Sequence, residues 1–201
     1  MLQHQTTTED FHPSTLADIY QPDVTIAIWQ RELNNAIRCY ANFLIAQSPY
    51  FQTRLILSPA AIVTELEKVL PPHLQRRAFV DDIFLLTDMF SCLFDLEAVG
   101  VRLAVLQKAM CPRFHTDKVP ARLVTTYVGA GSQWLDNDCV MRSEGGRVEV
   151  PDHAPVNNLQ RGQVALLKGE GWEGNEGRGL VHRSPQASPD EPRLVLTLDF
   201  A

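Results

Sequence analysis

The chain has 201 residues, of which 45% are hydrophobic, and its formal net charge at pH 7 is -6. This length and apolar fraction are enough for one buried core, so we predict a single domain over residues 1–201. The negative charge argues against nucleic acid or an anionic membrane surface as a partner, and no apolar stretch is long enough to span a membrane.

The N-terminus and the cysteines indicate the compartment. Met1 to Asp10 is polar and has no basic segment followed by an apolar run, as a secretion signal would have. The four cysteines lie far apart and include no Cys-x-x-Cys pair, so we expect reduced thiols. We therefore predict a cytoplasmic protein.

The first hundred residues are predicted to form a helix-rich layer. Asp23–Trp29 has the apolar, β-branched character of a short strand, and Gln30–Gln47 carries apolar residues at helical spacing. A second helix is expected after Ser58, which can serve as its N-cap, with Pro59 at the first helical position. This helix should stop before Pro71, because proline cannot continue it.

A third helix is predicted from Ala78 to Ala98, where apolar residues form a broad stripe, and Gly100 is placed to end it. Beyond Gly100 the apolar period changes to two, with turn-forming residues between the apolar runs. Many short strands of this kind favour a sandwich or small barrel, giving an α+β protein. The predicted strands are Val101–Met110, Ala121–Val128, Val148–Pro151, Gln163–Lys168, Gly179–Arg183 and Arg193–Phe200.

The chemistry of the chain concentrates at His115 and Asp117. If this segment is extended, the two side chains lie on the same face and can bind one metal ion together. His182 lies in an apolar segment that can run as a neighbouring strand and bring a third ligand. Two imidazoles and one carboxylate leave coordination positions open, which is typical of non-haem iron(II) oxygenases.

Arg193 opens the last predicted strand and strengthens this interpretation. Residues on one side of that strand are suited to packing under the helices, namely Leu194, Leu196, Leu198 and Phe200. The other side carries Arg193, Val195, Thr197 and Asp199. A guanidinium on the interior side of a barrel can bind a carboxylate through two parallel hydrogen bonds.

The pattern of His115, Asp117, a distant His182 and then Arg193 resembles the iron(II)- and 2-oxoglutarate-dependent dioxygenase superfamily. The resemblance covers Val101 to Ala201. Two segments are similar to the prolyl-hydroxylase-like branch, namely Tyr127–Trp134 and Arg161–Lys168. More closely, the chain looks like a bacterial family of unknown function that carries C-P-R-F-H-x-D, G-x-x-x-x-W-L and H-R-S-P followed by L-T-L-D-F.

This resemblance implies a double-stranded β-helix, a jelly-roll or cupin-like core over residues 101–201, with the helical layer of residues 1–100 packed on it. It implies that His115, Asp117 and His182 bind Fe(II) and that 2-oxoglutarate chelates this ion. Arg193 would hold the distal carboxylate of 2-oxoglutarate, with Tyr127 as a second contact. The implied reaction decarboxylates 2-oxoglutarate to succinate and hydroxylates a substrate that the sequence does not identify.

One position departs from the superfamily pattern, since Val195 stands where some branches have serine two residues after the arginine. The alternative to an oxygenase is a non-enzymatic cupin-like protein that binds zinc or iron through the same three ligands. Cys111 is a further zinc candidate, although a small buried hydrophobic residue is the commoner role of such a cysteine. A β-sandwich interaction module, with His115 and Asp117 as a surface pair, is the third possibility.

Two loops are expected to determine the substrate, Leu135 to Gly146 and Gly169 to Gly177. The second is rich in glycine but lacks the Gly-Lys-Ser/Thr ending of a phosphate-binding loop and carries glutamates. We predict a mobile lid or hairpin over the site there.

Overall fold

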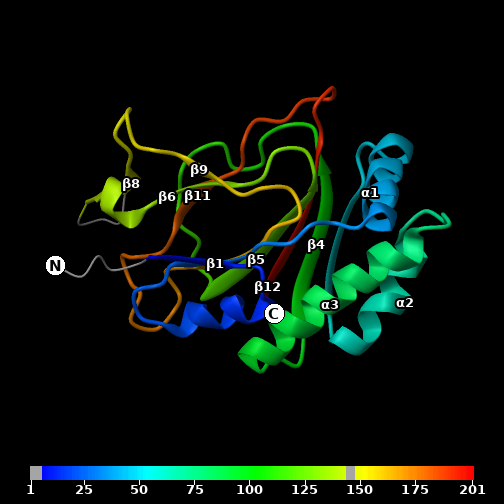
Figure 1. Ribbon diagram of the computed structural model, residues 1–201, viewed down its shortest axis with the longest axis horizontal. Coiled ribbons are helices and arrows are strands. Elements are labelled where there is room, and N and C mark those ends of the chain that lie inside the picture. Colours follow the sequence, from blue (N-terminus) through cyan, green and yellow to red (C-terminus); the bar gives the residue numbers. More distant parts are fainter. Residues whose placement is uncertain (1–5, 144–147) are drawn as a thin grey trace.

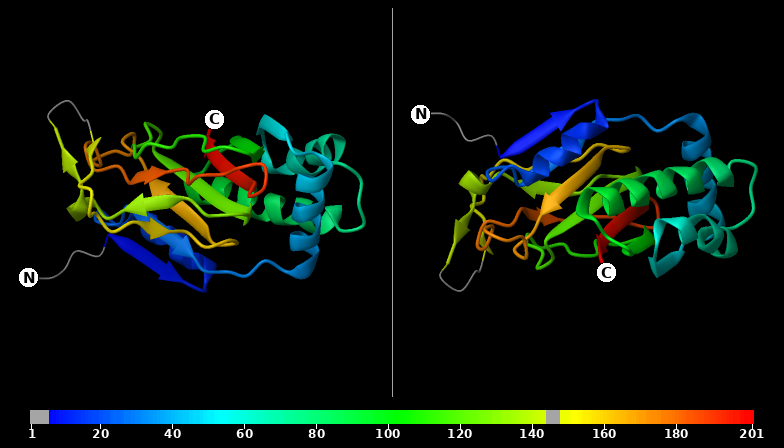
Figure 2. Two further views of the ribbon diagram at one scale, coloured as in Figure 1. Left: turned by 90° about the horizontal axis from the view of Figure 1, so that it is seen from above. Right: turned by 90° about the horizontal axis from the view of Figure 1, so that it is seen from below.

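The computed structural model describes residues 6–143 and 148–201, and its fold is mixed α+β (Figure 1). Residues 1–5 of the N-terminal stretch and residues 144–146 of the predicted substrate loop lie outside these ranges. Figure 2 shows that α1 and α2 (cyan) lie at one end of the molecule and that β7 and β8 (yellow) lie at the other. Among the helices of the described residues, none is long and apolar enough to cross a membrane.

Three α-helices form the helical layer: α1 (Asn35–Gln47), α2 (Pro59–Val69) and α3 (Arg76–Phe94). The first begins later than predicted, because the Asn34 side chain accepts a hydrogen bond from the Ile37 backbone N–H at 2.9 Å and caps the helix there. The second begins as predicted, with Ser58 at the N-cap position and Pro59 at the first helical position.

The prediction that Gly100 ends the third helix is wrong. The helix stops at Asp95, which adopts a left-handed conformation with φ 53°, and the backbone N–H of Leu96 donates to the carbonyl of Ser91. Asparagine and aspartate reach this conformation more easily than most residues with a side chain. Gly100 instead lies inside the strand that follows.

The main sheet has seven strands, and its outer strands come from the N-terminal half of the chain. In spatial order they are β1 (Thr7–Asp10), β2 (Ile26–Trp29), β10 (Val164–Lys168), β5 (Ala121–Val128), β12 (Arg193–Phe200), β4 (Val99–Leu106) and β3 (Gln52–Leu57). All neighbours are antiparallel except β1 and β2. Both ends of β5 and β12 agree with the prediction, whereas β1 and β3 were not predicted, because short edge strands carry a weak apolar pattern.

Two smaller sheets complete the β structure. One contains β11 (Val181–Arg183), β6 (Gln133–Leu135) and β9 (Asn157–Asn158), and the other contains β7 (Met141–Arg142) and β8 (Val148–Glu149). A short 3-10 helix lies at Asn137–Cys139, and a longer one lies at Pro13–Tyr20.

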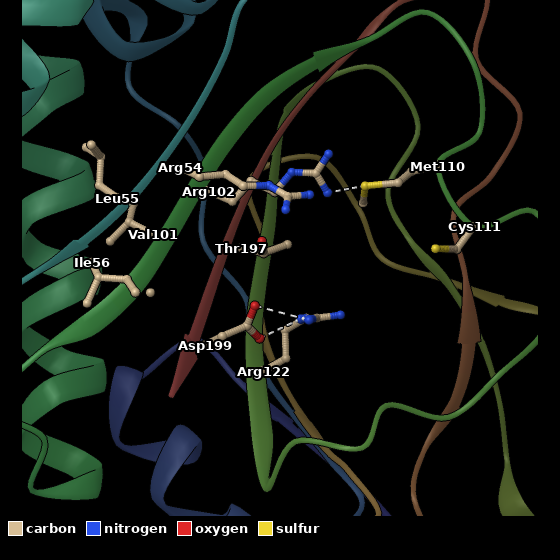
Figure 3. Close-up of a pocket in the computed structure, with 11 residues that line it drawn as sticks. Arg54, Leu55, Ile56, Val101, Arg102, Met110, Cys111, Arg122, Thr197 and Asp199 are labelled. Carbon is tan, nitrogen blue, oxygen red and sulfur yellow. Dashed lines mark hydrogen bonds and ion pairs between the residues drawn. The ribbon is translucent and has the colours of Figure 1, made fainter. Parts of the chain in front are cut away.

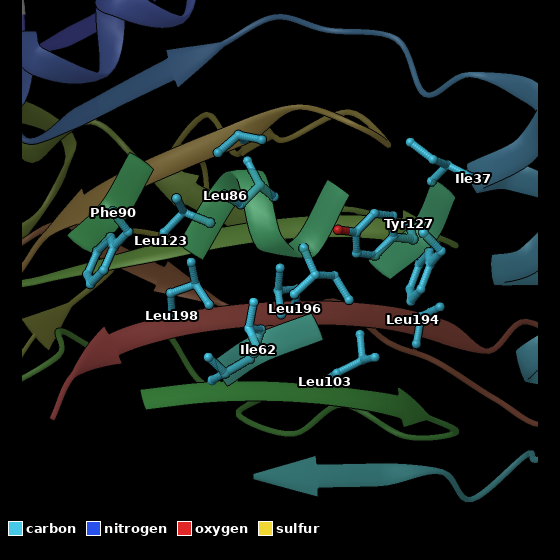
Figure 4. Close-up of a cluster of buried hydrophobic side chains, with 14 of the residues drawn as sticks. Ile37, Ile62, Leu86, Phe90, Leu103, Leu123, Tyr127, Leu194, Leu196 and Leu198 are labelled. Carbon is cyan, nitrogen blue, oxygen red and sulfur yellow. The ribbon is translucent and has the colours of Figure 1, made fainter. Parts of the chain in front are cut away.

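The two faces of the main sheet belong to different apolar clusters. Leu194, Leu196 and Leu198 of β12 point into the same cluster as Leu86 and Phe90 of α3 (Figure 4). Residues of the opposite face join a second, smaller cluster that includes Trp134 of β6 and Val195 of β12. The predicted division of β12 into two faces is therefore confirmed.

Candidate metal centre

His115 and His182 are brought together by their backbones. The two residues form a short antiparallel bridge, in which each backbone N–H donates to the carbonyl of the other at 3.0 Å. His182 lies in the middle of β11, opposite Trp134, and is buried. Because the bridge aligns the two residues, their rings lie side by side with centroids 4.6 Å apart.

The tautomer of both histidines leaves the same ring nitrogen free. His115 Nδ1 lies 3.0 Å from the carbonyl of Arg113, and His182 Nδ1 lies 3.1 Å from the carbonyl of Leu180. Since a carbonyl only accepts, each Nδ1 carries a proton and donates it, and in the neutral ring the lone pair then lies on Nε2. Hydrogen bonds of this kind orient histidine ligands in metal sites.

Both free Nε2 atoms face the carboxylate of Asp117. The distance from His115 Nε2 to Asp117 Oδ1 is 3.7 Å, and that from His182 Nε2 to Asp117 Oδ2 is 3.4 Å. Within residues 6–143 and 148–201, these three residues are the one group of His, Cys, Asp or Glu side chains whose ligand atoms converge, all within 4.8 Å. The structure thus brings the three predicted ligands together, and their donor set fits a divalent transition metal.

Arg122 of β5 holds the carboxylate of Asp117 in place. Its Nη1 donates to Asp117 Oδ2 at 2.7 Å, while Nε and Nη2 donate to the carboxylate of Asp199 at 2.7 and 3.1 Å. Sequence reasoning missed this residue. The available signal was its position, because an arginine inside the apolar strand Ala121–Val128 requires a partner of opposite charge.

The surroundings favour an ionised Asp117. Burial alone raises the pKa of this carboxyl, but interactions with His182, Arg122 and His115 outweigh burial, so the pKa lies below its usual value. The backbone of the segment is also fixed, since the Asp117 carbonyl accepts from the Glu170 N–H at 2.8 Å. A Cβ on Gly169 would lie 2.0 Å from the carbonyl oxygen of Val119, so glycine is required for this close approach.

The segment predicted as a lid supports the backbone that carries Asp117. Its first residues bind the backbone of residues 117–120, and the Asn175 side chain donates to the carbonyl of Gly169 at 3.0 Å. Trp172 packs against the aromatic rings of Tyr20 and Phe94.

Arg193 lies at the start of β12 on the same side of the main sheet as the metal candidates, with 1% of its surface exposed. Its hydrogen bonds go to neutral oxygens: Nε to the Ala130 carbonyl at 2.5 Å, Nη1 to Ser184 Oγ at 2.6 Å and Nη2 to Thr126 Oγ1 at 3.4 Å. Among the described residues, no carboxylate forms an ion pair with this guanidinium. Burial lowers the pKa of Arg193 to about 10.

Tyr127 does not lie at the site, so its predicted contact with a cosubstrate is wrong. The side chain points to the helical face of the main sheet (Figure 4), where its hydroxyl donates to Asp82 Oδ2 at 2.7 Å. The cause is strand alternation, because Thr126, its neighbour in β5, faces Arg193. Burial raises the pKa of Tyr127 well above its usual value.

The cysteine candidate for zinc receives no support from the geometry. Cys111 is exposed and does not belong to the converging group. Together with Met110, it lines a cavity of about 50 Å³ whose walls include His115, His182 and Arg193. The remaining lining combines polar side chains with four apolar ones, Leu106, Val124, Leu167 and Val195.

The fold is similar to that of several solved structures. A protein from Shewanella oneidensis described as an oxygenase has a TM-score of 0.51 at 10% identity, with 96% of this chain and 89% of that chain covered. A prolyl-4-hydroxylase from Pseudomonas putida has a TM-score of 0.49 at 12% identity, covering 93% and 96% of the two chains. A 2OG-Fe(II) oxygenase family protein from Caulobacter crescentus has a TM-score of 0.48 at 13% identity, covering 96% and 85%.

At 10% identity, the likeness to the Shewanella protein shows a shared fold. No curated protein matches the chain in sequence. A protein-family model described as "Protein of unknown function (DUF1826)" matches residues 10–199.

Proposed function

We propose that this chain, which belongs to the DUF1826 family, is an iron(II)- and 2-oxoglutarate-dependent oxygenase that hydroxylates an organic substrate. One observation carries the proposal. The two imidazoles that face Asp117 share a single pocket with the buried guanidinium of Arg193, which has no carboxylate partner among the described residues. A metal site and an anion site side by side are what a chelating keto acid with a second carboxylate requires.

In this proposal the main sheet and the sheet of β11, β6 and β9 are the two sheets of a double-stranded β-helix. The helical layer then covers the outer face of the main sheet, and the site lies between the two sheets. The location of His182 on β11 and of Arg193 on β12 supports this assignment, as does the fold likeness to the Shewanella protein. His115, Asp117 and His182 would then occupy one end of the inner space.

Bound iron(II), 2-oxoglutarate and dioxygen would supply the oxidising chemistry: one oxygen atom of dioxygen would enter succinate as 2-oxoglutarate loses carbon dioxide, and the other would hydroxylate the substrate. The Nε2 atoms of His115 and His182 and an oxygen of Asp117 would hold the metal from one side. Arg122 keeps the Asp117 carboxylate oriented and ionised. The apolar side chains of Val124 and Val195 line the same pocket.

The distal carboxylate of 2-oxoglutarate would bind Arg193. Its present partners are neutral oxygens, so exchange for a carboxylate gives a stronger, charge-assisted pair. The hydroxyls of Ser184 and Thr126, which already lie beside the guanidinium, would stand in for the serine that Val195 replaces. Because the cavity holds about 50 Å³, we expect Ser184 and Arg193 to move when the cosubstrate enters.

The proposal is tested by adding iron(II) and 2-oxoglutarate to the purified chain without oxygen. We expect a visible metal-to-ligand absorption band and, after oxygen is admitted, slow formation of succinate even without substrate. A chain that retains zinc tightly and gives neither signal would instead be the non-enzymatic metal-binding protein. Absence of any bound metal would contradict both functions.

A further inference from the structure

A second, larger cavity adjoins the candidate metal centre. It has a volume of about 770 Å³ and lies over the site-facing side of β3, β4 and β12, and we call it the arginine groove. Its charged lining residues are Arg54, Arg102, Arg122 and Asp199 (Figure 3). Met110, Cys111, Arg122 and Thr197 line both this groove and the metal pocket, so the two spaces are neighbours.

The positive charges of the groove lie close enough to repel one another. Arg54 of β3 and Arg102 of β4 are directly opposed cross-strand partners, an arrangement that destabilises a sheet. The one carboxylate in the lining, Asp199, is already bound by two nitrogens of Arg122. Burial lowers the pKa of Arg102, and the charges of Arg54 and Arg122 lower it further.

The guanidinium groups at the groove retain unused hydrogen-bond donors. Arg102 donates to Gln52 Oε1 at 3.2 Å and to the sulfur of Met110, which is a weak acceptor. Its buried Nε has no hydrogen-bond partner within the described part of the chain. Arg54 is exposed, and in the same ranges it forms no ion pair with a carboxylate.

The net charge of the whole chain is -6, so this local excess of positive charge runs against the average of the molecule. A cleft with one sign of charge attracts ligands of the opposite sign. The groove also has an apolar part, since Ile56 lies beside the arginines and is 72% exposed. Its volume falls within the range of small-molecule sites.

We infer that the arginine groove binds the substrate of the proposed oxygenase, and that this substrate is a small molecule with an anionic group, a carboxylate or a phosphate, attached to an apolar body. Arg54 and Arg102 hold the anionic group, and the apolar body extends past Met110 and Thr197 toward the metal. The inference rests on the proposed function for the identity of the reacting site. The binding step itself requires neither metal nor cosubstrate.

The test is calorimetric titration of the metal-free full chain, at low ionic strength, with benzoate, phenyl phosphate and the neutral benzamide. We expect one or both anions to bind and benzamide to bind at least tenfold more weakly. The double variant Arg54→Gln, Arg102→Gln should weaken anion binding tenfold or more. The tighter of the two anions identifies the preferred anionic group.

The matched control is Arg38→Gln, Arg161→Gln, which removes two exposed arginines outside the groove and changes the net charge equally. It should bind both anions as the natural chain does. Arg193→Met separates the groove from the cosubstrate pocket and should also retain anion binding. If the double groove variant does not fold, Arg54→Gln alone replaces it, because Arg54 is exposed.

Four results would overturn the inference: no anion binding, equal binding of benzamide, equal weakening in the control, or loss of binding only in Arg193→Met. Because the titration uses neither iron nor 2-oxoglutarate, its failure leaves the proposed oxygenase standing. Failure of the natural chain to form succinate, with anion binding intact, would contradict the oxygenase and leave the groove as an anion site.

Discussion

Two arginines with largely buried side chains, on opposite faces of the main sheet, show how differently those faces are built. On the helical face, Arg31 donates to both oxygens of Asp82, at 2.5 and 3.1 Å, and Tyr127 donates to the same carboxylate. On the site face, the hydrogen bonds that Arg193 donates to the described residues all go to neutral oxygens.

The pKa values of the two arginines follow this difference. Burial lowers the pKa of Arg31, but Asp82 and Tyr127 outweigh burial and raise it, whereas burial acts without such compensation at Arg193. A buried cation with a carboxylate partner is stabilised by the chain itself. One without a partner is suited to an anion that arrives from solution.

The largest expected effect is at the metal ligands of the site face. Asp117→Ala removes one of three converging donors, so iron(II) affinity should fall by more than about 100-fold, beyond the usual loss when a supporting residue is changed. Titration with iron(II), monitored by calorimetry, measures this affinity. Arg193→Lys is the control and should retain the metal, because its side chain is not a predicted ligand. Unchanged affinity in Asp117→Ala would remove Asp117 from the site.

The comparison of the two arginines gives the next prediction. Asp82→Asn leaves Arg31 buried with its charge uncompensated, so the free energy of unfolding should fall by about 3 kcal/mol or more. Arg193→Met removes an unpaired buried charge, so the free energy of unfolding should change by less than about 1 kcal/mol, while 2-oxoglutarate binding is lost. Urea unfolding checks both variants. Equal destabilisation would show that the two faces do not differ in this way.

Arg122→Gln should have an intermediate effect. The variant loses the ion pair that orients Asp117, and residues of this kind typically contribute 10- to 100-fold in metal affinity. We expect metal to bind more weakly by about that factor, measured by competition with a coloured chelator. An unaltered affinity, in a variant that unfolds at the same urea concentration as the natural chain, would contradict this role.

The smallest effect is expected at Tyr127. Tyr127→Phe removes one buried hydrogen bond to Asp82 and should lower the free energy of unfolding by about 1 kcal/mol. Since the side chain lies on the helical face, the affinity for 2-oxoglutarate should not change. A weaker cosubstrate complex in Tyr127→Phe, measured by the visible absorption band, would contradict the position assigned to this residue.

The sequence by itself determined features that depend on local alternation and on ligand chemistry. His115 and Asp117 are two residues apart, and the two faces of β12 can be read from its alternating side chains. Both ends of β5 could be predicted because Pro120 and Gly129 flank it, and the start of β12 because Pro192 precedes it. The candidate ligand set followed from residue type and order alone.

Only the tertiary structure decided which faces meet. The helical face of β5 carries Tyr127 and the site face carries Arg122 and Thr126, and this depends on how β5 lies between β10 and β12. The arginine groove likewise exists because β3, an edge strand, pairs with β4 and sets Arg54 opposite Arg102. Alternation along a strand is a local property, whereas strand pairing joins segments far apart in the chain.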